Sequence, residues 1–133
     1  NRKWLQQLSS LSGKGEIRIF ATRDDIPLLM DAADILVTKP GGLTVTEAMV
    51  KRLPMVLFEA LPGQEQANRD YLLRHGAACR ATPDTLLVEV VRLIRNPQVR
   101  RHMSRQLETL ASPHAVSQIV ERSLYQKRLN SAL

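Results

Sequence analysis

Cysteines and long apolar segments are scarce in this chain of 133 residues. A single cysteine, Cys79, excludes a disulfide within the chain and is compatible with a reducing compartment. Because Cys79 lies in an apolar segment, we interpret it as a small core residue and not as a nucleophile. No apolar run approaches the roughly 18–20 residues that cross a bilayer, and the first residues, NRKWLQQL, do not resemble a signal peptide.

Acidic residues are scarce in the last third of the chain. Residues 1–91 carry equal numbers of basic and acidic residues, so the net charge of +6 arises in residues 92–128. There, Arg100, Arg101 and Arg105 are expected to point outward from a helix. Such a flank suits an anionic membrane surface or nucleic acid, and otherwise is a solvated helix face. Aromatic residues, the usual platforms for nucleic acid, are only 4% of the chain, so we expect no nucleic-acid partner.

Short apolar runs alternate with helical patterns along the chain. Strands are expected at residues 17–21, 35–37, 55–58 and 77–81, and helices at 2–11, 26–33, 43–52, 64–74, 82–94, 97–111 and 113–127. Strands that are apolar throughout are typical of a parallel sheet with helices on both faces. The sequence therefore predicts an α/β fold, a Rossmann-like parallel sheet, in one domain over residues 1–133.

Three loops lead from an expected strand into an expected helix, at residues 22–25, 39–43 and 59–64. Ligands of parallel sheets bind at the carboxyl ends of the strands, where such loops gather. These loops also hold the most unusual residues of the sequence. We therefore predict that the ligand site lies among them.

The second loop belongs to the stretch TKPGGLTVTEA, in which two glycines separate a strand from a helix. Gly41 and Gly42 leave the first N–H groups of the helix open to an anion, and Thr44 adds a hydroxyl. The stretch lacks the lysine of a P-loop. A structural interpretation is equally good, because Thr44 and Glu47 have the spacing of a capping box that closes the helix start.

Carboxylate and amide side chains follow two of the loops and suit a hydroxyl-rich ligand. If its helix begins near Gly42, Glu47 lies one turn in and can accept the hydroxyls of a ribose. In the stretch PGQEQAN, we expect Gln64, Glu65 and Asn68 to crowd one face of a helix start. Ordinary polar surface is the alternative for both groups.

Together, TKPGGLTVTEA, LPMVLFEALPGQEQAN and YLLRHGAA resemble the C-terminal domain of family 28 glycosyltransferases, over about residues 15–110. The most similar branch is that of processive diacylglycerol glucosyltransferases and monogalactosyldiacylglycerol synthases. The resemblance implies a GT-B fold, in which two Rossmann-like domains face a cleft. It also implies that the C-terminal domain binds a UDP-sugar, that the N-terminal domain docks a lipid acceptor, and that the inverting transfer of the hexose needs no metal or cofactor.

By position, the resemblance assigns each part of the donor to residues of this chain. The diphosphate would be held by the backbone N–H groups of Gly41, Gly42, Leu43 and Thr44 and by the Thr44 hydroxyl. The ribose would be held by Glu47, and Gln64, Glu65 and Asn68 would contact the hexose or the phosphates. The uracil would meet the loop that contains Thr22 and Arg23, where Ala21 and Thr22 replace the usual glycine and aromatic residue.

By the same comparison, we expect the chain to begin inside the donor-binding domain and to lack the acceptor domain, which supplies the general base. The catalytic residues are therefore unknown, and the fragment would bind donor but hardly transfer it. The implied partners are a UDP-sugar, a lipid acceptor such as diacylglycerol, an anionic membrane surface, and the missing domain or a partner subunit. The implied location is the cytoplasmic face of a membrane. Two other classes stay open: a non-catalytic nucleotide-sugar-binding subunit completed by a partner chain, and a nucleotide-sugar 2-epimerase.

Overall fold

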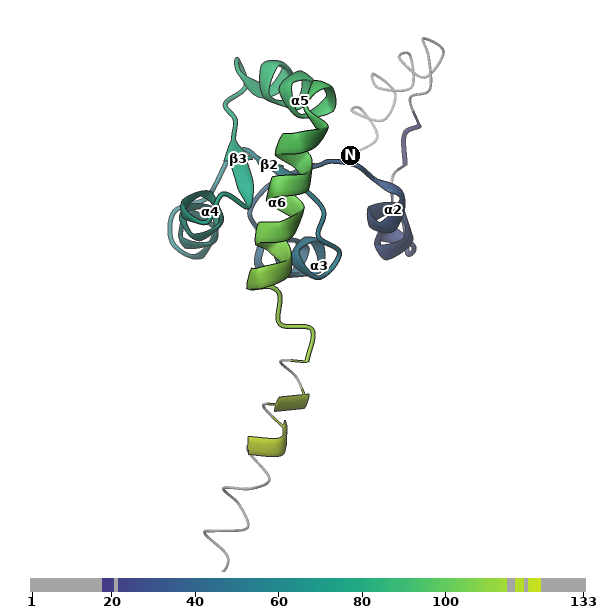
Figure 1. Cartoon of the computed structure of the whole chain (residues 1–133), viewed down its shortest axis with the longest axis vertical. Coiled ribbons are helices and arrows are strands. Elements are labelled where there is room, and N and C mark those ends of the chain that lie inside the picture. The colour runs from purple at the N-terminus through teal and green to yellow at the C-terminus, as the bar shows by residue number, and fades with distance from the viewer. Residues whose placement is uncertain (1–17, 21, 115–116, 119, 123–133) are drawn as a thin grey trace, which may run out of the picture.

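The centre of the fold is a small parallel sheet (Figure 1). The computed structural model describes residues 18–20, 22–114, 117–118 and 120–122. The strands, in sheet order, are β1 (Leu36–Thr38), β2 (Met55–Leu57) and β3 (Ala78–Arg80). Both pairings are parallel, so all three strands end at the same edge of the sheet. This is the edge at which the sequence predicted the ligand site.

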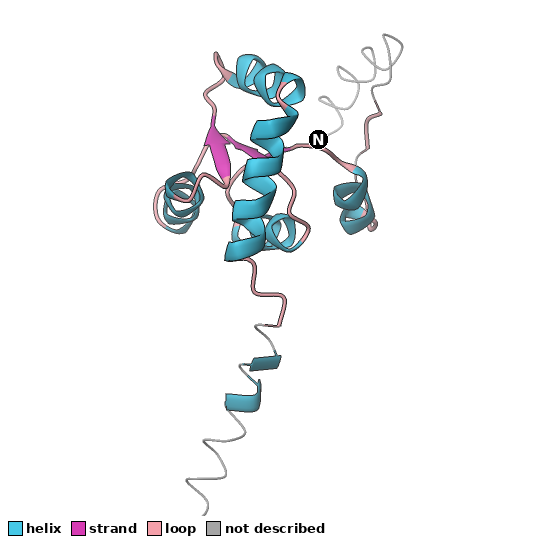
Figure 2. Cartoon of the chain, in the orientation of Figure 1, coloured by secondary structure: helices cyan, strands magenta, loops and turns pink. Residues whose placement is uncertain are grey.

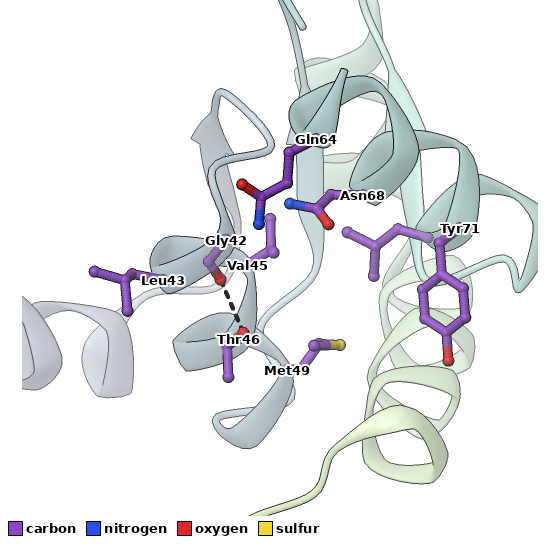
Figure 3. Close-up of a pocket in the computed structure, with 9 residues that line it drawn as sticks. Gly42, Leu43, Val45, Thr46, Met49, Gln64, Asn68 and Tyr71 are labelled. Carbon is purple, nitrogen blue, oxygen red and sulfur yellow. Dashed lines mark hydrogen bonds between the residues drawn. The ribbon is translucent and has the colours of Figure 1, made fainter. Parts of the chain in front are cut away.

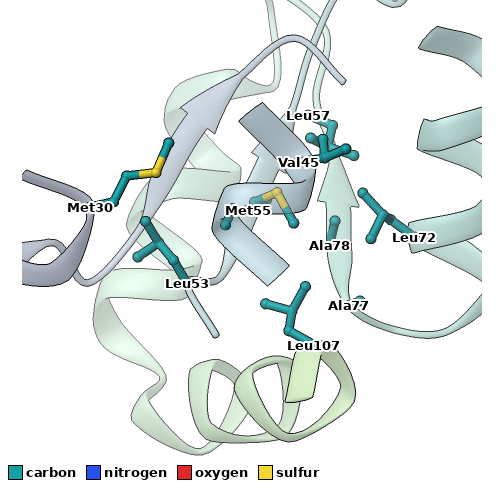
Figure 4. Packing of buried hydrophobic residues seen from close by; sticks show 10 residues of the cluster. Met30, Val45, Leu53, Met55, Leu57, Leu72, Ala77, Ala78 and Leu107 are labelled. Atoms are coloured by element: carbon teal, nitrogen blue, oxygen red, sulfur yellow. The ribbon is translucent and has the colours of Figure 1, made fainter. Parts of the chain in front are cut away.

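Two crossover helices, α3 (Gly42–Val50) and α4 (Gln64–Arg74), connect consecutive strands and pack on one face of the sheet. Successive crossovers in the same direction place their helices on the same side. The larger hydrophobic cluster fills the space between these helices and the sheet (Figure 4). Its buried members are Met30, Val45, Ala48, Leu53, Met55, Leu57, Leu72, Ala77, Ala78 and Leu107.

The other face of the sheet is covered by α5 (Leu86–Arg95) and α6 (Pro97–Leu110). Side chains alternate along a strand, so Val56 points to this face and packs with Ala81, Leu93 and Met103. Leu107, one turn beyond Met103, belongs to the larger cluster, so α6 joins the two cores. Helices thus cover both faces of the sheet (Figure 2), and the predicted fold class is confirmed.

A short helix, α2 (Ile26–Ala32), precedes β1 and contributes only Met30 to the buried core. Two other apolar residues of this helix, Ile26 and Leu29, are 41% and 40% exposed. The end of α2 lies beside the end of α3, where Asp31 forms an ion pair with Lys51.

The expected strand at residues 17–21 is wrong where the structure describes it. Residues 18–20 are not in a strand, and among the described residues β1 pairs only with β2. Apolar, β-prone residues form a strand only when ladder hydrogen bonds join them to a neighbour. The expected helix at residues 2–11 lies outside the described residues.

The start of α5 also differs from the prediction, which placed it at residue 82. Thr82 and Thr85 form a turn, with Thr85 N–H donating to the Thr82 carbonyl at 3.1 Å and to its hydroxyl at 3.3 Å, so the helix begins at Leu86. Threonine hydroxyls compete for backbone groups in this way at helix starts. Within α5, Leu93 is fully buried, whereas Leu87 is 73% exposed.

Beyond α6, only part of the expected helix at residues 113–127 is described. Residues 117–118 and 120–122 are helical, and the remainder of that prediction lies outside the described residues. Within the described ranges, no helix is both long and apolar enough to cross a membrane.

Candidate functional site: the carboxyl edge of the sheet

The stretch TKPGG forms a tight turn between β1 and α3. The Gly41 N–H donates to the Lys39 carbonyl at 2.9 Å, and Pro40 between them is fully buried. The Gly41 N–H, one of the groups predicted to face the diphosphate, is therefore used inside the turn. The turn directs the chain into α3 immediately after the strand edge.

The start of α3 leaves three backbone N–H groups open. The helix begins at Gly42, and its first internal bond runs from the Val45 N–H to the Gly41 carbonyl at 3.0 Å. By helix geometry, the N–H groups of Gly42, Leu43 and Thr44 have no acceptor within the helix, and they carry its partial positive charge. No side chain caps this end. An anion can approach these donors at the point where the glycine has no side chain.

The capping-box interpretation of Thr44 and Glu47 is wrong. A capping box requires Thr44 at the N-cap, but Gly41 occupies that place and Thr44 is the third residue of the helix. Residues of that position lie inside the first turn, so the threonine cannot close the helix start. Glu47 is correspondingly one turn in and exposed, as the ribose hypothesis requires.

A groove of about 650 Å³ lies between α3 and α4, beside the open helix start. Its polar end is formed by Gly42, Gln64 and Asn68, and both amide side chains point toward Gly42 (Figure 3). A Cβ atom placed on Gly42 would lie 3.7 Å from Gln64 Nε2 and 3.9 Å from Asn68 Nδ2. The glycine therefore keeps open the junction of the helix start and the amide pair.

Asn68 is partly committed to holding the turn. Its Nδ2 donates to the Pro40 carbonyl at 3.0 Å, a contact that joins residues 28 positions apart. The bond fixes the turn, and with it the first N–H groups of α3, against α4. Oδ1 is the acceptor of this amide and can accept a hydrogen bond from a ligand hydroxyl, and Nδ2 keeps a second N–H. The Gln64 side chain also borders the groove.

Glu65 does not share the face of Gln64 and Asn68, so that part of the prediction is wrong. Its Oε2 accepts a hydrogen bond from the Leu61 N–H at 2.8 Å, which closes the loop before α4. Gly63, in that loop, is the N-cap of α4 and has a φ of 94°, a conformation that favours glycine. Glu65 thus shapes the loop, and it is not among the residues that line the groove.

Thr44 and Glu47 lie on a different side of α3 from the groove. Neither lines the groove, whereas Val45, Thr46 and Met49 do. Glu47 shares its side with Lys51, one turn later, and Lys51 forms an ion pair with Asp31 on α2. Glu47 therefore faces α2, and Gln64 and Asn68 lie toward α4. The open helix start stands between the two groups.

The loop that contains Thr22 and Arg23 is held by an ion pair. Arg23 Nε donates to Asp25 Oδ1 at 2.6 Å, and the guanidinium lies 4.3 Å from the centre of the Phe20 ring. The hydrogen bond from Arg23 lowers the pKa of Asp25 and raises the pKa of Arg23. The aromatic ring of this loop is therefore Phe20, two residues before the expected position, and the Arg23 side chain is already occupied.

Sequence reasoning missed Lys39 and Glu59, which follow β1 and β2 and form an ion pair at 3.7 Å. Glu59 has a φ of 46°, a sparsely populated conformation for a residue with a side chain. Sequence reasoning also missed Met49 and Tyr71, which line the apolar end of the groove. Each lies seven residues after a predicted site residue, Gly42 or Gln64, so the two-turn helix period could have indicated them.

Cys79 is half-buried, and its Sγ lies 3.7 Å from the Met55 carbonyl oxygen. Burial raises the pKa of its thiol, which keeps it protonated at neutral pH. A protonated thiol beside the backbone of the neighbouring strand β2 supports the interpretation of Cys79 as a packing residue.

An open parallel sheet with a glycine-opened helix start at its carboxyl edge is the arrangement of a Rossmann-like domain. The sequence places this domain in a known family. The family described as "Glycosyltransferase family 28 C-terminal domain" matches residues 1–119, and the chain belongs to it. The resemblance drawn from the three motifs is thereby confirmed.

The relatives in this family include named glycolipid enzymes. The processive diacylglycerol beta-glucosyltransferase of Bacillus pumilus (strain SAFR-032) is 28% identical over 127 residues, covering 93% of this chain and 33% of the relative. The enzyme of the same name from Bacillus mycoides (strain KBAB4) is 27% identical with the same coverage. The chain therefore spans about a third of the length of these curated relatives.

Two solved structures share the fold. MurG of Acinetobacter baumannii has a TM-score of 0.70 and 26% identity, covering 84% of this chain and 33% of that protein. The glycosyltransferase of kitacinnamycin has a TM-score of 0.56 and 27% identity, covering 72% of this chain and 27% of that one. Both are glycosyltransferases with the GT-B fold, which supports the Rossmann-like assignment.

Proposed function

We propose that this chain is the donor-binding C-terminal domain of an inverting glycosyltransferase, which moves a hexose from a UDP-sugar to a lipid acceptor such as diacylglycerol. The observation that carries the proposal is the open start of α3 beside the Gln64 and Asn68 amides, in a member of family 28. The diacylglycerol acceptor comes from the names of the Bacillus relatives.

The donor is proposed to extend from the loop before α2, past the start of α3, to α4, with the uracil at the first end and the hexose at the last. The uracil meets the loop around Thr22 and Arg23, and the ribose hydroxyls donate to Glu47. The diphosphate meets the N–H groups of Gly42, Leu43 and Thr44, with the Thr44 hydroxyl as a further donor. The hexose then lies near Gln64 and Asn68, which border the groove. Glu65 supports this end of the site by holding the Leu61 loop.

The chemical contribution of this domain is charge stabilisation. When the hexose leaves, negative charge develops on the departing UDP, and fixed backbone N–H groups at a helix start need no reorganisation to receive it. Lys39, one residue before Pro40, is paired with Glu59, so the positive potential at the turn comes from the helix start. The general base that activates the acceptor hydroxyl is proposed to belong to a second domain or to a partner subunit.

The membrane partner is proposed on the basis of charge and acceptor. A transferase that acts on a diacylglycerol has to reach an acceptor within a bilayer, and the basic residues between 92 and 128 favour an anionic surface. We propose peripheral attachment at the cytoplasmic face, and transfer only after the acceptor-binding half is present.

Titration calorimetry with UDP, UMP and ADP tests the donor assignment. We expect UDP to bind, UMP to bind more weakly because it lacks the second phosphate, and ADP to bind more weakly because the base differs. No heat with UDP, or equal affinity for ADP, would contradict the proposal.

A further inference from the structure

A second, cationic groove lies at the opposite end of α3 from the donor site. It has a volume of about 360 Å³ and is lined by Arg52, Arg101, Ser104, Arg105 and Glu108. A neighbouring hollow of about 320 Å³ shares Arg52, Arg101 and Ser104 with it. We propose that this arginine groove binds the phosphate of an anionic phospholipid headgroup. The choice of a lipid as its source rests on the proposed lipid-modifying function.

Arg52 has an unusual backbone conformation for its residue type. Its φ is 54°, and it occupies the position after the C-cap of α3 that glycine favours. The Leu53 N–H donates to the Ala48 carbonyl at 2.9 Å and the Arg52 N–H to the Met49 carbonyl at 3.0 Å, the pattern of a Schellman motif. An arginine held in this conformation, with its side chain in a groove, indicates a use for the guanidinium.

The groove has more positive than negative charge. Arg52 Nη1 donates to Glu108 Oε1 at 3.0 Å, which accounts for the one acidic residue that lines it. Arg101 and Arg105 lie one turn apart on α6, are exposed, and form no ion pair with a described residue. Two neighbouring guanidiniums and the Ser104 hydroxyl between them offer the planar donors that suit a phosphate.

Arg100 does not belong to this set, so its expected outward position is corrected. Its Nη1 donates to the carbonyls of Leu93 at 2.6 Å and Ile94 at 2.7 Å, at the end of α5. The last carbonyls of a helix have no partner within it, and a cationic donor satisfies them. Changing Arg100 would therefore disturb the fold and is unsuitable as a test of anion binding.

Two features favour a lipid headgroup over the nucleotide donor or a nucleic acid. α3 has nine residues, so its ends lie about 13 Å apart, too far for one phosphate to touch both. No aromatic residue lines the groove, so bases would find no stacking surface. A phosphodiester headgroup needs only the charge and the donors that the groove provides.

Vesicle co-sedimentation of the full chain tests the proposal, with phosphatidylcholine vesicles and vesicles that also contain phosphatidylglycerol. The test variant is Arg101→Gln/Arg105→Gln, and the control is Arg74→Gln/Arg95→Gln, which removes the same charge outside the groove. We expect binding only to the anionic vesicles, weakened by high salt, and a loss of about 30-fold in the test variant. The control should lose much less.

Several results would overturn the proposal. Equal losses of vesicle binding in both variants would mean that net charge alone, and not the groove, attracts the lipid. Binding that is the same to neutral and anionic vesicles would point to an apolar contact. Competition by free glycerol phosphate at the same concentration as lipid phosphate would identify a soluble phosphate as the ligand, and tighter binding of RNA would identify a nucleic acid. UDP titration of the same samples tests the donor site separately. A chain that binds UDP but no anionic vesicle would therefore refute lipid binding in the arginine groove and leave the proposed function standing.

Discussion

The two ends of α3 carry positive potential by different means. At its start, a glycine and a fully buried proline leave three backbone N–H groups open, and the charge is that of the helix itself. One residue beyond its C-cap, Arg52 occupies a conformation that favours glycine and points its charge into a groove. The helix dipole favours an anion at the first end and opposes one at the second.

This difference has consequences for what each end can recognise. Backbone donors at a helix start are fixed in direction, so they suit a ligand whose charge must be received without movement. Arginine side chains on the surface reach over a wider range of positions and are screened by salt. The first end therefore suits a chemical step, and the second suits attachment.

The largest effect is expected from Gly42→Asp, which sharpens the comparison. A carboxylate at the first helical position interacts favourably with the helix dipole, and the space at Gly42 allows a Cβ atom with ordinary contacts. We expect the free energy of unfolding to be unchanged or higher, and UDP affinity to fall roughly 100-fold or more through charge repulsion. Chemical denaturation and calorimetry measure the two quantities. Intact UDP affinity would show that the diphosphate lies elsewhere.

The next effect is expected from Glu47→Ala, which tests the ribose assignment. Removing the carboxylate should weaken UDP binding by about 1–3 kcal/mol, because ribose hydroxyls lose their acceptor. Stability should hardly change, since Glu47 is exposed and caps nothing. Binding of inorganic diphosphate, which has no ribose, is the control. If both ligands weaken alike, Glu47 acts on the loop rather than on the ribose.

A smaller effect should separate Asn68 from Gln64. Asn68→Leu removes the hydrogen bond to the Pro40 carbonyl, so UDP should weaken by about 1 kcal/mol, and UDP-hexose should weaken further because the Oδ1 acceptor is lost as well. Gln64→Ala should weaken only UDP-hexose, because Gln64 borders the groove and does not hold the turn. Calorimetry with both ligands decides this. The assignment of Gln64 to the hexose would be wrong if its variant weakened UDP as much as UDP-hexose.

The smallest effect is expected from Arg52→Gly. Glycine relieves the left-handed conformation, and the exposed ion pair with Glu108 contributes little, so the free energy of unfolding should rise by up to about 1 kcal/mol. Glu108→Gln is the control, since it breaks the same ion pair without changing the backbone. A fall in stability in Arg52→Gly alone would mean that the arginine side chain stabilises the fold despite its strain.

The sequence predicted the features of the site that depend on neighbours along the chain. The glycine turn, the start of α3 near Gly42 and the position of Glu47 one turn later all follow from local spacing. The parallel sheet was likewise predictable from apolar runs such as MVL, whose three residues are all fully buried.

The features that the sequence did not predict depend on contacts between distant residues or on competing local hydrogen bonds. The bond from Asn68 to Pro40 joins two elements, so no spacing rule indicates it. Glu65 had the right spacing from Asn68, but the Leu61 N–H offered it a closer partner. Arg100 looked like a surface residue because the sequence does not show that the end of α5 lies within its reach.

A single UDP titration, run on the wild-type chain, on Gly42→Asp and on Arg101→Gln/Arg105→Gln, tests the central claim that α3 receives the donor diphosphate at its start. We predict that UDP binds the wild type, that Gly42→Asp loses this binding, and that the arginine variant keeps it to within about twofold, since distant sites act independently. No binding to the wild type, or binding that survives in Gly42→Asp and is lost in the arginine variant, would contradict the claim.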